Sequence, residues 1–194
     1  MNFTYIYLLF LIGSTIYRIG RLIKSYSDQQ RPSRVYFSIT YPLMLFLYLT
    51  VWCGSIFEYF YFRYILDAKE INILMSGIGF LMYFGVIPLR KWAADTLGKH
   101  MSQDIKIFEE HKLIKNGPYR YIRHPLISCA IIEVFGLALI PNSYWTFLIG
   151  LFGFMPLMVI RAYLEEKALI EEFKDEYLKY KKEVFAFFPI KRAK

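Results

Sequence analysis

The sequence has only two cysteines, Cys53 and Cys129, and each lies inside a long apolar run. Two thiols this far apart form neither the closely spaced ligand set of a zinc site nor a disulfide framework. We interpret both as small buried apolar residues. The histidines His100, His111 and His124 are spaced by eleven and thirteen residues, which matches no zinc pattern. No metal is therefore expected.

Several nucleotide-binding and hydrolase motifs are also absent. The chain has no G-x-G-x-x-G after a strand, no G-x-x-x-x-G-K-[ST], and no Ser-His-Asp signature that can be placed. It has no Gly/Ser-rich linker, internal repeat or low-complexity tract. A cleavable signal-peptide pattern is missing as well, so the first apolar run is expected to remain as a membrane span.

The chain is instead rich in apolar residues. Of 194 residues, 56% are hydrophobic and 20% aromatic, whereas a soluble domain is about 45–50% apolar. A spanning helix needs about 20 residues, and three of the five runs reach that length. The last two runs are shorter and are separated by the turn residues Pro141-Asn142-Ser143, which predicts a helical hairpin. The runs are 3–23, 37–62, 71–89, 126–140 and 144–160.

This pattern predicts an all-α integral membrane protein with about five transmembrane helices. We expect a single membrane domain over 1–194, with three N-terminal helices in 1–89. The second half, 90–194, would hold a polar loop, the hairpin and a C-terminal amphipathic helix that stops before Pro189.

The formal net charge of +8 comes from basic residues that flank the apolar runs. This placement favours membrane orientation over nucleic-acid binding. The first loop, the third loop and the tail carry most of the Lys and Arg, so the positive-inside rule places them in the cytoplasm. Five spans agree with that assignment at every loop. The prediction is a multi-pass protein with its N-terminus outside and its C-terminus inside.

Polar and aromatic residues gather before the fourth span, in the stretch GPYRYIRHP. Proline at the first helical position holds the preceding His124 at a helix N-terminus. His124 is then either a capping or interfacial histidine or part of a site. Gly117-Pro118 forms either an ordinary turn or a close approach to a ligand. Tyr119 and Tyr121 are either interfacial aromatics or ring contacts for a base or cation.

The inner end of the fifth span carries Arg161 and Glu165, four residues apart on one helix face. They form either an exposed ion pair of small effect or part of a site. Glu133 lies inside the fourth span, where an ionisable residue is a functional candidate by default. The sequence assigns it no role.

Three ordered stretches in residues 90–190 together resemble the isoprenylcysteine carboxyl methyltransferase family. The first leads from a His-x-Leu run into a Gly-x-Tyr, the second is Arg-His-Pro, and the third pairs an arginine with a following Glu-Glu. In this chain the stretches are His111-Lys112-Leu113-Ile114 with Gly117-Pro118-Tyr119; Arg123-His124-Pro125; and Arg161 with Glu165-Glu166, followed by Phe173 to Tyr180.

The resemblance implies S-adenosylmethionine as cofactor, a cytoplasmic cofactor-binding cap, and a lipid acceptor that arrives from the bilayer. Arg161 would meet the acceptor carboxylate as the substrate-binding and catalytic residue. The cofactor pocket would be lined by His111, Lys112, Leu113, Ile114, Tyr119, His124, Pro125, Leu126, Ile127 and Glu165.

This chain departs from the family at two places. Ile127 stands where the family often has tyrosine, which removes one side-chain contact. Lys174 follows Phe173 where members usually have glycine, and the loss of that glycine turn suggests a more continuous helix.

The expected reaction is esterification of the carboxylate of a prenylated cysteine. A carboxylate is already ionised at neutral pH, so the transfer needs alignment and no general base. One alternative is N-methylation of a phospholipid amine, for which His124 or Glu165 would act as base. Others are a reductase related to the sterol reductases and a non-catalytic lipid-binding protein. The partners expected are the lipid substrate and membrane lipids, with no nucleic acid; the oligomeric state is not indicated.

Overall fold

A computed structural model describes residues 3–27, 34–37, 39–67, 70–98, 105–107 and 113–189. Six α-helices run through these segments: α1 (Phe3–Ser27), α2 (Thr40–Phe60), α3 (Ile73–Leu97), α4 (Pro125–Leu139), α5 (Tyr144–Ile149) and α6 (Met155–Glu183). Short π-helical stretches follow α2 (Tyr61–Ile65) and join α5 to α6 (Gly150–Phe154). A 3₁₀ turn, Gly117–Arg120, precedes α4.

Four helical segments are long and apolar enough to cross a membrane: Phe3–Arg21, Thr40–Ile65, Ile73–Leu97 and Tyr144–Glu183. Pro125–Leu139 is a shorter apolar helix and forms the first arm of the hairpin. The chain is therefore an integral membrane protein, and the all-α fold class is confirmed. One addition is a two-stranded antiparallel ribbon in which β1 (Arg34–Phe37) pairs with β2 (Ile105–Ile107).

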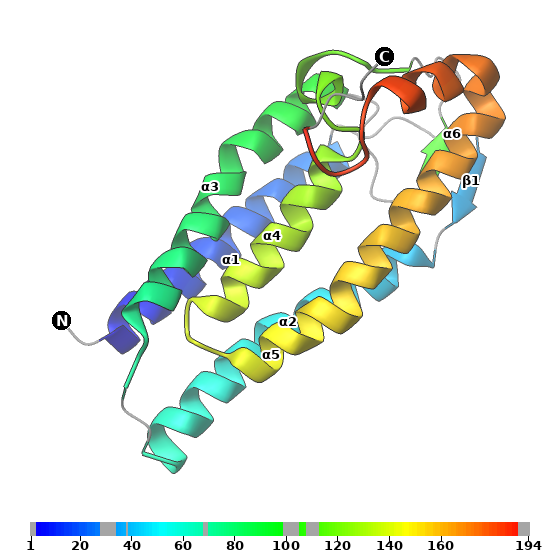
Figure 1. The fold of residues 1–194 in the computed structure, drawn as a ribbon. Helices are drawn as coiled ribbons and strands as arrows, with labels where there is room; N and C mark the ends of the chain where they lie inside the picture. The colour runs from blue at the N-terminus through cyan, green and yellow to red at the C-terminus, as the bar shows by residue number, and fades with distance from the viewer. Residues whose placement is uncertain are drawn as a thin grey trace.

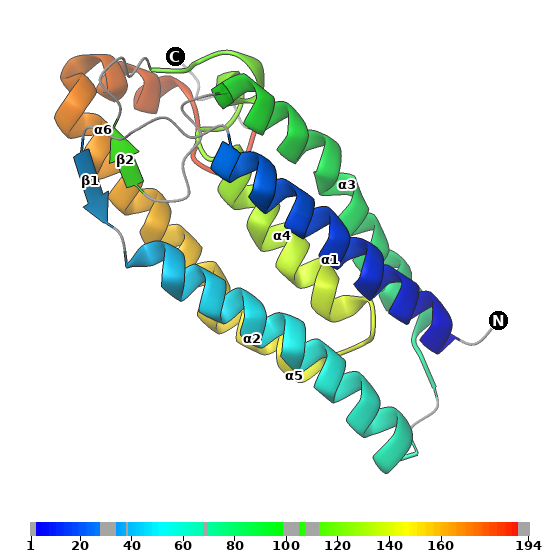
Figure 2. The same ribbon diagram turned by 180° about the vertical axis from the view of Figure 1, so that it is seen from behind.

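The helices run along one long axis and diverge toward one end (Figures 1 and 2). Helices α1, α3 and α4 lie side by side, while α2 follows the α5–α6 rod. The C-terminal part of α6 lies at the divergent end, next to the turn before α4 (Figure 1). The elements that the sequence analysis singled out therefore meet at this end.

Helices α3 and α4 cross closely at Gly79 and Gly136. A methyl group on Gly79 would lie 2.6 Å from the backbone nitrogen of Ile140, and one on Gly136 would lie 2.8 Å from the Gly79 carbonyl oxygen. Small residues let backbones approach closely where lipid supplies no hydrophobic drive. This crossing fixes α4, and with it the Arg-His-Pro segment at its start.

Helix α3 extends beyond the end of the third apolar run. The run was expected to end just after Pro88, but the helix passes through Pro88 and continues to Leu97. A proline removes one hydrogen bond, and transmembrane helices tolerate it where neighbours satisfy the freed groups. The last two turns of α3 therefore project toward the divergent end.

The hairpin turn has the conformation expected from its residues. Asn142 adopts a positive φ of 62°, and its side-chain oxygen accepts a 2.6 Å hydrogen bond from the backbone nitrogen of Asn72. The two cysteines behave differently from one another. Cys129 is fully buried, but Cys53 is exposed on α2, so the prediction that both are buried is wrong for Cys53. In a membrane span an exposed thiol faces an apolar medium, and sequence alone does not separate that face from the core.

Helix α6 kinks at Lys174, where φ is 47° and ψ is −121°. The more continuous helix predicted for this stretch is therefore wrong. The kink is retained without glycine, and a residue with a Cβ occupies a backbone conformation that glycine adopts freely. Because of this bend, the last turns of α6 fold back across the divergent end (Figure 1).

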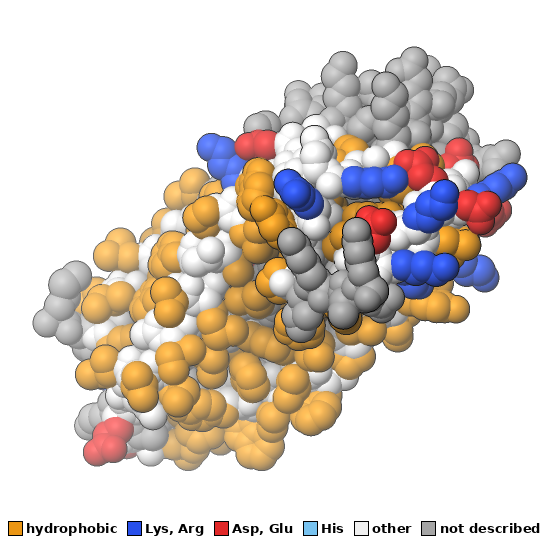
Figure 3. Space-filling model, turned by 45° about the horizontal axis from the view of Figure 1, so that its top comes forward, with side chains coloured by type: hydrophobic (Ala, Val, Ile, Leu, Met, Phe, Trp, Pro, Cys, Tyr) orange, Lys and Arg blue, Asp and Glu red, His pale blue; other side chains and the backbone are white. Residues whose placement is uncertain are grey.

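Charged side chains gather over that end, while apolar side chains cover most of the remaining face in Figure 3. This division is the one expected for a bundle in lipid with a polar end in water.

Candidate active site

The site begins where the chain after α6 returns to the Arg-His-Pro segment. Ile122 forms a parallel bridge with Phe185. The backbone nitrogen of Arg123 donates to the Phe185 carbonyl at 2.9 Å, and that of His124 donates to the Ala186 carbonyl at 2.9 Å. Proline at 125 then starts α4 without needing a hydrogen-bond acceptor for its nitrogen. The segment is therefore held from both sides before the helix begins.

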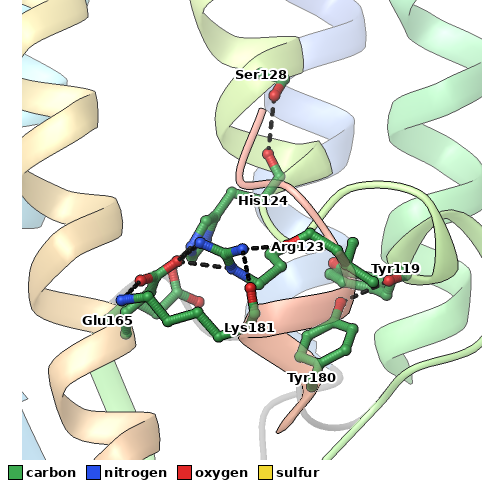
Figure 4. Close-up of polar contacts among 9 residues, drawn as sticks. Tyr119, Arg123, His124, Ser128, Glu165, Tyr180 and Lys181 are labelled. Carbon is green, nitrogen blue, oxygen red and sulfur yellow. Dashed lines mark hydrogen bonds and ion pairs between the residues drawn. The ribbon is translucent and has the colours of Figure 1, made fainter. Parts of the chain in front are cut away.

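His124 lies between two neighbouring carboxylates of α6 (Figure 4). Its Nε2 is 3.2 Å from Oε1 of Glu166, and its Nδ1 is 3.6 Å from Oε2 of Glu165. The imidazole side chain is only 4% exposed. With a carboxylate at each nitrogen, the ring is best satisfied as a doubly protonated imidazolium.

Glu166 is the centre of a buried ion network. Arg123 donates through Nε at 2.8 Å and Nη2 at 2.6 Å to its Oε1, and Lys181 Nζ lies 2.6 Å from its Oε2. Arg123 also donates through Nη1 to the Val184 carbonyl. This network links the turn before α4 to both arms of the kinked α6 (Figure 4).

Glu165 differs from Glu166 in its accessibility. Its side chain is 41% exposed, against 9% for Glu166. Adjacent helical residues point about 100° apart, so one carboxylate is enclosed by cations while the other keeps an open side. Glu165 is therefore the carboxylate available to a ligand.

Arg161 lies one turn before Glu165 and is buried, with 8% exposure. Its Nη1 donates a 3.0 Å hydrogen bond to Oγ1 of Thr40, at the start of α2. An anchored guanidinium and an accessible carboxylate thus lie one turn apart on the same helix.

The turn before α4 is locked in place by two contacts. The Tyr180 hydroxyl donates a 2.5 Å hydrogen bond to the Tyr119 carbonyl. Gly117 has a φ of 56°, and a methyl group there would lie 2.6 Å from Oγ1 of Thr96 on α3. Glycine is required here both by conformation and by space.

Burial and charge shift two titratable groups outside the spans. Burial lowers the pKa of His124, but the hydrogen bonds and charges of Glu165 and Glu166 outweigh it and raise the pKa above its ordinary value. Burial, aided by the Glu165 charge, raises the pKa of Tyr119. Both shifts favour the protonated forms, which are the imidazolium of His124 and the neutral phenol of Tyr119.

Residues 78–171 match the isoprenylcysteine carboxyl methyltransferase (ICMT) family. This range holds the turn before α4, the Arg-His-Pro segment and the Arg161–Glu166 stretch of α6. This match, which covers 94 of the 194 residues, supports assignment of the chain to the ICMT family. Family members are methyltransferases that generally depend on S-adenosylmethionine.

Two curated bacterial proteins are also similar to this chain. The uncharacterized protein YpbQ of Bacillus subtilis is 27% identical over 132 residues, which cover 68% of this chain and 74% of that protein. An uncharacterized protein of Haemophilus influenzae is 29% identical over 114 residues, which cover 57% of this chain and 66% of that protein.

The structure brings several of the predicted site residues together. Tyr119, His124, Arg161 and Glu165 lie at the divergent end, while Leu113 and Ile114 are half-buried before the turn. Pro125 is buried and Leu126 half-buried in the first turn of α4, and Ile127 packs into the apolar core. His111 and Lys112 lie outside the described residues.

Three residues of this candidate site were not predicted as parts of it. Glu166 and Lys181 belong to the buried network, and Phe187 lies against the His124 ring with centroids 5.9 Å apart. The Glu-Glu pair was the available signal for Glu166. For the segment after α6 the only signal was its run of apolar and aromatic residues beyond a polar helix.

Proposed function

We propose that the chain is an S-adenosylmethionine-dependent methyltransferase that esterifies the carboxylate of a prenylated cysteine at the membrane. The observation that carries this proposal is the pairing of an accessible Glu165 with an anchored Arg161, one turn apart at the polar end of the bundle. The Glu165 carboxylate would bind the cationic cofactor, and the Arg161 guanidinium would bind the anionic acceptor.

The residues at this end fit a cofactor of this kind. S-adenosylmethionine supplies a methyl group on a positively charged sulfur, and its ammonium and hydroxyl groups are hydrogen-bond donors that a protein can bind. Glu165 would accept hydrogen bonds from such donors. The Tyr177 hydroxyl is buried and has no hydrogen-bond partner within the described part of the chain, so a ligand oxygen would satisfy it. His111 to Ile114, Tyr119 and His124 to Ile127 would form the surrounding wall.

Arg161 would hold the acceptor carboxylate through charge-assisted hydrogen bonds. Its bond to Thr40 fixes the guanidinium before an acceptor arrives, which is the positioning that a methyl transfer requires. The carboxylate is ionised at neutral pH and needs no base. His124 faces a carboxylate at each nitrogen, so it is poorly placed to take a proton from an ammonium. This geometry favours an oxyanion acceptor over a lipid amine.

The polar end would lie in the cytoplasm, since the positive-inside rule places the Lys- and Arg-rich segments there. The turn before α4, the kinked end of α6 and residues 184–187 would together form a cap over the cofactor. A cap that excludes water strengthens the ionic contacts beneath it. The lipid acceptor would enter from the bilayer, between diverging helices.

The test is methyl transfer from labelled S-adenosylmethionine by the detergent-purified full chain. The acceptors are an N-acetyl-S-prenyl cysteine and, in parallel, phosphatidylethanolamine. We expect base-labile label on the prenyl cysteine, with a loss of about 100-fold or more in Arg161→Ala. Label on the amine lipid alone would replace the proposal with N-methylation. No label on either acceptor by a protein that does not bind the cofactor would leave a non-catalytic lipid-binding protein.

A further inference from the structure

A second polar cluster lies within the bundle and takes no part in the candidate active site. Glu133 of α4 forms an ion pair with Arg18 of α1 through one oxygen, and its other oxygen lies 2.5 Å from Nη2 of Arg90 of α3. Arg21 lies three residues after Arg18 on α1, so the two guanidinium groups project from neighbouring positions of that helix. The carboxylate that the sequence left without a role therefore joins three helices.

The charges of this cluster do not balance. Arg18, Arg21 and Arg90 are three permanent cations, and Glu133 is the carboxylate that the described residues place beside them. In addition, Nε of Arg90 is buried without a hydrogen-bond partner among those residues. Surplus positive charge at membrane depth is costly unless an anion compensates for it.

One side of the cluster, at Glu133 and Arg90, is buried, and the other side, at Arg18 and Arg21, is accessible. The side chains of Glu133 and Arg90 are 7% and 12% exposed, whereas that of Arg18 is 31% exposed and Arg21 is half-buried. The Arg18 guanidinium lies 3.5 Å from the centre of the Tyr48 ring on α2, which fixes its position. An anion would therefore reach the guanidinium groups from the accessible side, at Arg18 and Arg21.

The cluster is separate from the candidate active site. Glu133 lies nine residues after His124 on α4, a rise of about 13 Å along the helix. Exposed isoleucines continue along α1 on both sides of Arg18, at Ile12, Ile16, Ile19 and Ile23. An anion held here would thus have apolar helix surface directly beside it, as the headgroup of a lipid requires.

We propose that Arg18, Arg21 and Arg90 bind the phosphate of an anionic membrane phospholipid, with its acyl chains along α1. A phosphodiester offers one negative charge and two free oxygens, which suits the guanidinium fork. Basic pockets between transmembrane helices are known sites for anionic headgroups. The lipid would neutralise part of the surplus charge and tie α1 to α3 and α4.

The test is native mass spectrometry of the detergent-purified chain titrated with dioleoylphosphatidylglycerol or dioleoylphosphatidylcholine. We expect the anionic lipid to bind at least about tenfold more tightly. Arg21→Gln should weaken that binding about fivefold, and it leaves both ion pairs of Glu133 in place. The matched control is Lys91→Gln, which removes the same charge from an exposed position next to Arg90 and should leave the binding unchanged.

Equal affinities for the two lipids would overturn the proposal. So would an equal loss in Arg21→Gln and Lys91→Gln, because the effect would then be general surface charge. Thermal unfolding with millimolar inorganic phosphate separates the two sources of the anion. Protection by phosphate alone that equals protection by the anionic lipid would overturn the lipid assignment.

Discussion

Nε2 of His124 lies 3.2 Å from Oε1 of Glu166, and Nδ1 of the same imidazole lies 3.6 Å from Oε2 of Glu165. One ring at the start of α4 thus bridges two consecutive carboxylates of α6. This contact joins the hairpin to the kinked helix at the end where the family motifs converge. The charge state of the His124 imidazole therefore affects both the stability of the fold and the candidate active site.

The first prediction concerns pH. The folded-state pKa of His124 is raised above its ordinary value of about 6.5. Its contribution to stability is therefore fully present below about pH 6.5 and is lost as pH rises through the raised pKa. We expect the thermal unfolding temperature of the detergent-purified chain to fall across that range. In His124→Gln this part of the fall should be absent, and an unchanged pH profile would contradict the assignment.

The second prediction concerns the buried network. Glu166→Gln removes the carboxylate that faces Arg123, whose side chain is 6% exposed. An uncompensated buried cation destabilises by about 3 kcal/mol, so we expect a clear fall in the unfolding temperature. The matched change Glu172→Gln alters an exposed carboxylate on the same helix and should cost less than about 0.5 kcal/mol. Equal stability of the two variants would show that the network contributes nothing.

The third prediction concerns the kink of α6. Lys174 has a φ of 47°, a conformation that is strained for a residue with a Cβ. Lys174→Gly should therefore stabilise the chain by about 1 kcal/mol, as measured by thermal or denaturant unfolding. Lys179→Gly, at an exposed position in the same helix, should destabilise it by about 1 kcal/mol. If Lys174→Gly destabilises the chain as much as Lys179→Gly, residue 174 is helical and the kink is absent.

Much of the fold was predictable because lipid imposes strong patterns. Apolar runs of spanning length, the Pro-Asn-Ser turn and the proline at the start of α4 are all local signals, and the structure confirms each of them. The Arg-His-Pro and Glu-Glu stretches stood out in the sequence because polar groups are rare in such a chain, and the structure brings the two stretches together.

Other features depend on contacts between distant residues. Which of Glu165 and Glu166 is enclosed depends on how α6 is rotated about its axis, and the spacing of the motif does not fix that rotation. The pairing of Arg18 with Glu133 joins residues 115 positions apart. The kink at Lys174 was missed because this chain has no glycine there, and the missing glycine was interpreted as a missing turn. Tertiary contacts of the last turns of α6 hold the bend without it.

The most direct test of the central claim is calorimetric titration of S-adenosylmethionine into the detergent-purified chain, into Glu165→Gln, and into Glu172→Gln. The account predicts binding by the wild-type chain and by Glu172→Gln. In Glu165→Gln it predicts a loss of about tenfold or more, because the amide lacks the negative charge that would pair with the cationic cofactor. Absence of binding to a folded wild-type chain, or equal affinity in all three, would contradict it.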